Sequence, residues 1–291
     1  MTDQSYDSIT HYLDRFWQQA ATAIQQVIHD SELQNYAFML WASFSFIMLA
    51  HLLFQYVVNG TSLGNIIQTV LLIATVRILM NHYDDLTSAL WDTSEGISSG
   101  IQRVTLGTSD LWFASGFIQD VMGAISSEPI SWTSPVKIIL ATFFLYTSSC
   151  FLTIMAFVAA TWSLWGYVMA KMIGFFMVPL ILFERLSWLF DGWLRLFIGF
   201  LLYGILARIN VILCVISIQA FFDLPSGQLP TGQSFFFSME HMSDLIGLFC
   251  IMMLSIFALI SSGKFVGIIA GGGSGFGQNM REIMHSISHM K

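Results

Sequence analysis

The sequence predicts an all-α, polytopic integral membrane protein, and three observations support this fold class. Of the 291 residues, 55% are apolar and only 10% are charged, whereas soluble domains carry about 25% charged residues. The mean hydropathy is +0.70. Several apolar runs reach the length of about 20 residues that a helix needs to cross the hydrocarbon core of a bilayer. These features exclude an ordinary soluble enzyme.

The charge balance and the cysteines exclude two further classes of protein. The chain has 11 Lys and Arg against 18 Asp and Glu, so it offers no extended basic surface to a nucleic acid, and any contact with a polyanion must be local. The three cysteines all lie inside apolar runs. Because their number is odd and they lack metal-ligand spacing, we expect them to pack within the membrane.

Residues 1–35 are predicted to form an N-terminal amphipathic helix on the periplasmic side. Its apolar residues recur at spacings of three and four, at Ile9, Leu13, Phe16, Ala20, Ile24 and Val27. Asp7 and Ser8 are candidate N-caps. The helix either lies in the headgroup layer or packs on a helix of a partner, and the sequence leaves both open. The segment lacks the basic start of a signal peptide, so we expect it to be retained.

The next two regions differ sharply in polarity. Residues 36–80 hold two predicted transmembrane helices, 36–58 and 63–80, separated by an Asn59-Gly60 turn. Residues 81–135 are polar and acidic and are predicted to form a small periplasmic helical region. Two amphipathic helices are expected there, one marked by Leu86, Leu90, Ile97, Ile101 and Val104, and one by Leu111, Trp112, Phe117, Ile118, Val121 and Ile125.

Residues 136–262 are predicted to form the transmembrane core. The uncharged run 138–170 would make a helix of about 50 Å, too long for one upright span, so it should tilt, bend near Gly166 or project from the bilayer. Residues 172–183 are too short to cross and are predicted to form a re-entrant or interfacial segment, with a sixth crossing as the alternative. Spans at 196–222 and 245–260 bring the number to five. Residues 263–291 are predicted to be a Gly-rich tail.

Orientation follows from the basic residues of the short loops. Placing the C-terminus in the cytoplasm puts six basic residues there, namely Lys171, Arg185, Arg195, Lys264, Arg281 and Lys291. Four then lie on or near the outer side, namely Arg15, Arg77, Arg103 and Lys137. The sequence therefore predicts a periplasmic N-terminus and a cytoplasmic C-terminus in the inner membrane.

The sequence encodes no recognisable catalytic, cofactor-binding or metal site, so the protein is not expected to be an enzyme. It has no GxxxxGK[ST], HExxH, CxxC or GxSxG motif. The glycine-rich stretch 271–277 fits no GxGxxG register and is typical of a flexible linker. His285 and His289 are four residues apart, but no further ligand set completes a metal site, which favours a solvated tail.

Arg208 is the most distinctive single residue, because it falls near the middle of a predicted span. In one interpretation, several copies place it around a central cavity, where it meets a lipid phosphate or a translocated polyanion. In the other, which we favour, it forms a buried pair with Glu184 or Asp191, or snorkels to the surface. His51 is predicted to be a hydrogen-bonded packing residue, and Arg77 to snorkel towards Asp84 or Asp85.

One segment carries a resemblance to a known family. It begins with Lys171, contains Gly174 and Pro179, ends its apolar part at Phe183, and continues with Trp188, Leu189, Phe190, Trp193 and Leu194. This pattern resembles the core of the TrbL family, the polytopic inner-membrane subunits of bacterial type IV secretion and conjugation systems. The match in pattern is concentrated between residues 138 and 222, and the rest agrees in organisation.

The resemblance implies a non-enzymatic scaffold and channel component without a cofactor. Such a protein assembles with itself below a pilus or stalk and helps transfer DNA or protein. The partners implied are further copies of the chain, the lipid membrane, the minor pilin or stalk protein, the major pilin, bitopic inner-membrane subunits, the secretion ATPases and, transiently, transferred single-stranded DNA. The main rival is a secondary transporter for a small solute, because broken spans and an intramembrane arginine also occur in transporters.

The resembling segment supplies the proposed assembly or translocation site, together with Arg208. Gly174 and Pro179 weaken the helix, so the segment should turn at the cytoplasmic face, with Trp188 and Trp193 as interfacial anchors. Lys171 and Arg185 are predicted to form a positive rim that meets ATPases or an anionic substrate. The aromatic residues Phe175, Phe176 and Phe183 form an apolar constriction or a subunit contact, or they only pack the bundle.

Overall fold

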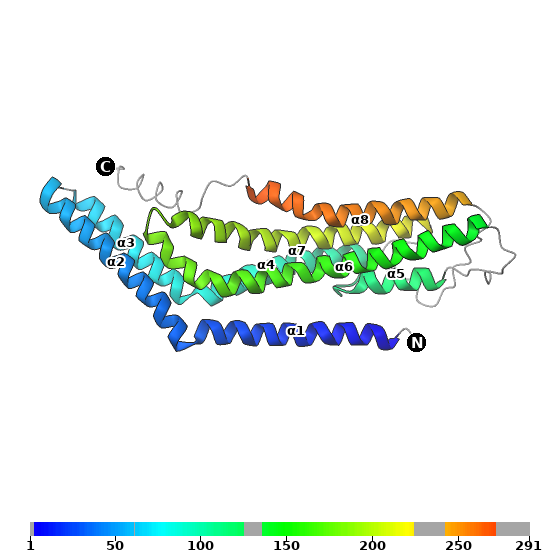
Figure 1. The fold of residues 1–291 in the computed structure, drawn as a ribbon, viewed down its shortest axis with the longest axis horizontal. Coiled ribbons are helices and arrows are strands. Elements are labelled where there is room, and N and C mark those ends of the chain that lie inside the picture. The colour runs from blue at the N-terminus through cyan, green and yellow to red at the C-terminus, as the bar shows by residue number, and fades with distance from the viewer. Residues whose placement is uncertain (1–2, 61, 125–135, 224–241, 272–291) are drawn as a thin grey trace. The chain divides into compact units, whose positions relative to one another are not determined.

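The computed structural model describes residues 3–60, 62–124, 136–223 and 242–271, which form eight α-helices and a 3-10 helix, with no strand among them (Figure 1). The elements are α1 (Asp3–His29), α2 (Ser31–Asn59), α3 (Leu63–Asn81), α4 (Tyr83–Leu106), α5 (Phe113–Ala124), α6 (Val136–Met177), η1 (Val178–Leu182), α7 (Ser187–Phe221) and α8 (Met242–Gly271). The all-α prediction is confirmed.

In the part of the chain that the structure describes, five stretches are long and apolar enough to cross a membrane, which agrees with the predicted number of spans. They are Ser31–Val58, Leu63–Asn81, Phe143–Leu182, Ser187–Phe221 and Ile246–Ile269. The chain divides into two compact units. The first comprises Met1–Thr10, Thr93–Leu164 and Leu201–Val266, and the second comprises His11–Asp92, Trp165–Phe200 and Gly267–Lys291.

The core of the first unit is built by α5, α6, α7 and α8. Its largest fully buried side chains include Phe117, Leu145, Leu152, Ile218, Leu248 and Met252. A polar contact ties α7 to α8, because the Asn210 amide donates to the Ala258 carbonyl at 3.2 Å and to the Ser262 hydroxyl at 2.7 Å. Hydrogen bonds of this kind hold helices together where the surrounding solvent is hydrocarbon.

The second unit begins with a helix whose environment the sequence left open. Phe16 stacks on Trp165, and Trp17 stacks on Trp91. Ala20, Ile24 and Ile28 are buried. From Phe16 onward, α1 therefore packs on other helices of its own chain. The helix begins at Asp3, before the predicted caps, and ends at His29, so residues 31–35 belong to α2.

Two short features shape the α2–α3 hairpin of this unit. The Asp30 carboxylate accepts hydrogen bonds from the backbone N–H groups of Glu32 and Leu33, which caps α2. Gly60 ends α2 in the left-handed region at φ 65°, a conformation that favours glycine. The hairpin packs on η1, where Phe44 stacks on Phe183.

The helix α4 buries a polar stripe rather than an apolar one. Its buried residues are Tyr83, Thr87, Ser94, Ser98, Gln102 and Leu106, whereas Leu86, Leu90, Ile97 and Val104 are exposed. Both helices predicted in residues 81–135 exist. However, of the five periodic apolar residues of the first, only Ile101 packs against the core, and the other four are exposed.

Two boundaries differ from the prediction. Helix α6 has no break after Ala170 and continues through Met177 into η1, so residues 172–183 are not a separate segment. Helix α8 continues to Gly271, so residues 263–271 are helical rather than part of a tail. The predictions for residues 272–291, including His285 and His289, lie outside the described residues.

Candidate functional site

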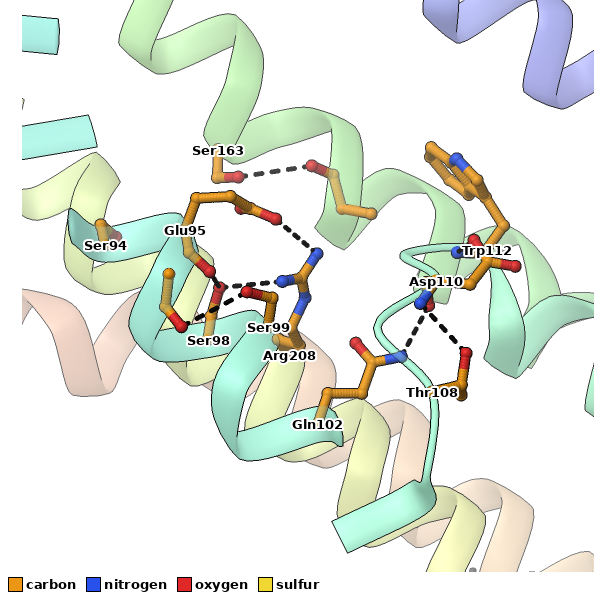
Figure 2. A network of polar contacts seen from close by, with 12 residues as sticks. Ser94, Glu95, Ser98, Ser99, Gln102, Thr108, Asp110, Trp112, Ser163 and Arg208 are labelled. Carbon is orange, nitrogen blue, oxygen red and sulfur yellow. Dashed lines mark hydrogen bonds and ion pairs between the residues drawn. The ribbon is translucent and has the colours of Figure 1, made fainter. Parts of the chain in front are cut away.

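The first candidate cluster surrounds Arg208, in the first unit. The arginine side chain is only 5% exposed, and its Nη2 lies 2.9 Å from Glu95 Oε1. Its Nη1 donates to Ser98 Oγ at 3.0 Å (Figure 2). Both acceptors come from α4. The buried arginine is therefore paired, but its partner is the exposed Glu95 instead of the expected Glu184 or Asp191.

The same stripe of α4 makes further hydrogen bonds. Ser94 Oγ donates to the Leu201 carbonyl of α7 at 2.9 Å, and Gln102 Nε2 donates to the Asp110 carbonyl at 2.6 Å (Figure 2). A buried cation or polar group is costly unless it finds a partner. The polar stripe of α4 can face inward because Arg208 and these carbonyl groups provide its hydrogen-bond partners.

The second cluster surrounds Lys171, in the second unit, and it corrects the predicted positive rim. Lys171 is 3% exposed, and its Nζ lies 2.6 Å from Asp84 Oδ1. The same ammonium group donates to Ser88 Oγ at 2.7 Å and to Tyr167 Oη at 3.2 Å. An enclosed and paired lysine cannot present its charge to a partner protein or substrate. Lys171 is therefore not part of a positive rim.

The electrostatics of the cluster fit an ionised carboxylate beside a neutral phenol. Burial raises the pKa of Asp84. Hydrogen bonds from Lys171 and Gln25, together with the charges of Lys171 and His29, outweigh burial and hold that pKa below its usual range. Burial, and then the proximity of Tyr167 and Asp84, raise the pKa of Tyr83 far above its usual value. Tyr83 therefore stays protonated and donates to the Lys171 carbonyl at 2.7 Å.

The pair of Asp84 and Lys171 also constrains the membrane topology. The sequence-based scheme placed residue 84 in the periplasm and residue 171 in the cytoplasm. Opposite faces of the hydrocarbon core are about 30 Å apart, whereas these side chains are 2.6 Å apart. The two placements cannot both hold.

The glycine and the second tryptophan of the predicted segment pack against each other. A Cβ atom at Gly174 would collide with the Trp193 ring and the Tyr83 hydroxyl, so close packing requires glycine here. Trp193 is 9% exposed, and its Nε1 donates to the Ala170 carbonyl at 2.7 Å. It is therefore a buried packing residue, whereas Trp188 is 66% exposed.

The remaining segment residues separate into buried and exposed groups. Pro179 is buried in η1, and Phe175 meets Tyr83 edge-on and also contacts Phe176. Phe183 stacks on Phe44, so each of the three phenylalanines contacts another ring of the same chain. Arg185 is exposed in the turn between η1 and α7, where the chain reverses.

Arg77 and His51 are polar residues of candidate spans. The sequence predicted the wrong partners for Arg77 and named no partner for His51. The Arg77 guanidinium lies over the rings of Phe38 and Trp41, not against Asp84 or Asp85. His51 Nε2 is 2.9 Å from the Gln55 amide, in keeping with a hydrogen-bonded histidine. Among the residues that the structure describes, no group of three or more His, Cys, Asp or Glu side chains could hold a metal ion.

The fold and the two charge clusters define a multi-pass helical membrane protein with ionic contacts between its helices. A family model described as TrbL/VirB6 plasmid conjugal transfer protein matches residues 45–263. The chain belongs to this family, which confirms the resemblance found in the sequence and makes the protein a component of conjugal transfer or type IV secretion. No curated protein and no solved structure matches the chain.

Proposed function

We propose that this chain is an inner-membrane scaffold and channel component of a bacterial type IV secretion or conjugation machine. The observation that carries the proposal is the family match, which includes residues from all five candidate spans. In this role the protein assembles with copies of itself below the pilus or stalk and aids the transfer of DNA or protein. Its C-terminus lies in the cytoplasm.

Partner ATPases supply the energy in this proposal. The sequence lacks the glycine-rich motifs that hold nucleotide phosphates, and the family is a structural component of conjugation rather than a known enzyme family. The other expected partners are the minor pilin or stalk protein, the major pilin and the bitopic inner-membrane subunits.

The two charge clusters support a scaffold role. Arg208 and Lys171 are both enclosed, and each is held by a carboxylate from α4. Ionic contacts in an apolar surrounding are satisfied only in a defined helix register, because a slip leaves a charge unpaired. They therefore favour a fixed frame of helices on which other subunits can assemble.

The turn between η1 and α7 is the proposed contact for ATPases or an anionic substrate. Arg185 and Trp188 are the members of the predicted segment that remain well exposed there. Because Lys171 is buried, the predicted positive rim reduces to Arg185.

Deletion of the gene, followed by complementation, tests the function. The deletion strain should lose conjugal transfer or secretion, and the gently solubilised protein should copurify as an oligomer with secretion subunits. Transfer at the normal rate without the gene, or a lone monomer, contradicts the scaffold proposal.

The variant Arg185→Gln tests the turn separately. Losing one charged contact worth about 1.4 kcal/mol reduces an equilibrium tenfold, so transfer should fall about tenfold while the membrane level of the protein stays normal. Lys264→Gln removes another exposed cation, from α8, and is the matched control with unchanged transfer. Normal transfer by Arg185→Gln rejects the role of the turn and leaves the scaffold role intact.

A further inference from the structure

A cavity of about 350 Å³ lies in the second unit, where α1 ends, α2 begins and α3 ends. Its polar lining consists of His29, Gln34, Asn35, Arg77, Asn81 and Asp84. The candidate span Leu63–Asn81 ends at this cavity. A span of this length reaches across the hydrocarbon core, so the cavity lies at the depth of the lipid headgroups.

Arg77 is the unusual residue of this cavity. Its guanidinium carbon lies 4.9 Å from the centroid of the Phe38 ring and 5.4 Å from that of Trp41. Trp41 is itself held by a hydrogen bond of 3.3 Å from its Nε1 to the Ile73 carbonyl. Within the described part of the chain, Arg77 makes no hydrogen bond and no ion pair, so its N–H donors are available to a ligand.

The acidic residue of the cavity does not neutralise Arg77. Asp84 is engaged by the Lys171 ammonium at 2.6 Å and by the Gln25 amide at 3.0 Å. With Asp84 and Lys171 counted as a neutral pair, the positive charge of Arg77 remains. Asn35 and Asn81 add neutral amide donors to the lining. A half-buried cation among donors is suited to an anion with several oxygen atoms.

We propose that this cavity binds the phosphate group of a phosphate ester, with a membrane phospholipid as the favoured source. A guanidinium binds phosphate through two parallel hydrogen bonds, and a ring beneath it fixes its plane. Basic pockets between membrane helices are suited to phospholipid headgroups. A soluble phosphate ester offers the same chemistry without acyl chains. The proposal does not depend on the secretion role.

Native mass spectrometry of the full-length, delipidated protein in detergent tests the site. Three probes separate the sources: dioctanoyl phosphatidylglycerol, dioctanoylglycerol, which lacks the phosphate, and sn-glycerol 3-phosphate, which lacks the chains. The wild type should retain phosphatidylglycerol at least tenfold more tightly than dioctanoylglycerol. Arg77→Gln should lose this preference, and Arg77→Lys should keep part of it, because lysine acts as a point charge.

The controls decide between a built site and general attraction to a cation. Arg15→Gln, which removes an exposed arginine from the same unit, should bind as the wild type does. If Arg77→Gln does not fold, Asn35→Ala and Asn81→Ala should each weaken retention several-fold. Equal binding of both lipids, or full retention by these variants, overturns the proposal. Tight binding of glycerol phosphate alone supports the phosphate site and overturns the lipid source.

Discussion

Glu95 determines how Arg208 is accommodated inside a candidate span. The glutamate side chain is 47% exposed, whereas that of Arg208 is 5% exposed. Removing Glu95 leaves an enclosed cation with only the neutral acceptor Ser98. Removing Arg208 leaves a carboxylate that is already half open. The pair should therefore respond asymmetrically to mutation.

We expect Glu95→Gln to lower the free energy of unfolding by about 3 kcal/mol, the order of cost of an uncompensated buried charge, and Arg208→Gln to lower it by less. Denaturant unfolding in detergent measures both values. Asp120→Asn, an exposed acidic residue of α5 in the same unit, should stay within about 0.5 kcal/mol of the wild type. If Arg208→Gln lowers the free energy of unfolding more than Glu95→Gln does, this account of the pair is wrong.

Asp84 should make the second unit sensitive to acid. Its pKa in the folded protein lies below the ordinary value, so its contribution to stability is present above the unfolded pKa of about 3.9 and is lost as the pH falls through the lower folded pKa. Thermal unfolding should therefore shift to lower temperature below about pH 4.

The variant Asp84→Asn isolates this contribution. It should lose that part of the acid dependence and be less stable at neutral pH, because Lys171 is then enclosed without a counter-charge. Asp85→Asn is the neighbouring control, since that carboxylate is 84% exposed and lies 3.6 Å from His82. Equal effects of the two variants would show that the contact with Lys171 contributes little.

At the scale of helices, the sequence predicted where a helix lies along the chain better than which of its sides is buried. The periodic residues Leu86 to Val104 correctly indicated a helix, and α4 covers them. They did not indicate which stripe is buried, because the partners of the polar stripe, Arg208 and the Leu201 carbonyl, come from a helix a hundred residues further on. The four-residue spacing of Ser94, Ser98 and Gln102 was the available signal.

The continuation of α6 past Gly174 has a similar explanation. Glycine usually weakens a helix, and the sequence therefore favoured a break in this segment. In the structure Gly174 is where the Trp193 ring packs closely, so the absence of a side chain serves a tertiary contact. Pro179 did mark a real change, since α6 gives way to η1 one residue before it.

A pair of glycine substitutions tests this contact. Gly174→Ala should destabilise the protein by about 1–3 kcal/mol, because an added methyl group must displace Trp193 or Tyr83. Gly192→Ala is the matched change in α7, where a Cβ meets nothing within 4 Å. It should be neutral or stabilise by up to about 1 kcal/mol through helix propensity. Thermal unfolding that ranks the two variants in the opposite order contradicts close packing at Gly174.

At the scale of the whole molecule, the contact between Asp84 and Lys171 bears on the number of crossings. From it we infer that the start of α4 and the end of α6 lie on one side of the membrane. Helix α6 crosses from its other end, Val136, so the chain between residues 84 and 136 must cross as well. Helix α4 has 24 residues and a length of about 36 Å. It is long enough to cross, but its acidic residues keep it out of the five apolar candidate spans. We therefore expect six crossings, with the exposed Asp92 of α4 facing water or another copy of the chain.

Six crossings place both termini on the same side, and the basic residues favour the cytoplasm. Arg15, Arg77, Lys171, Arg185, Arg195, Lys264, Arg281 and Lys291 then lie on or near that side, and Arg103 and Lys137 on the other. This arrangement reverses the side that the sequence alone predicted for the N-terminus.

Reporter fusions distinguish the two arrangements. Alkaline phosphatase should be inactive at either terminus and active when inserted at Thr108, in the loop between α4 and α5. An active fusion at the N-terminus together with an inactive one at the C-terminus would restore the scheme with five crossings and a periplasmic N-terminus.

The ion pair of Arg208 and Glu95 also sets an order of events during synthesis. The two residues are separated by 113 positions, so at 5–20 residues per second the acid leaves the ribosome roughly 6–23 s before the base. The span that contains the arginine therefore reaches the bilayer when its counter-ion has already been made. A nascent chain interrupted between residues 171 and 208 can already form the contact of Asp84 with Lys171, whereas Glu95 still lacks its base.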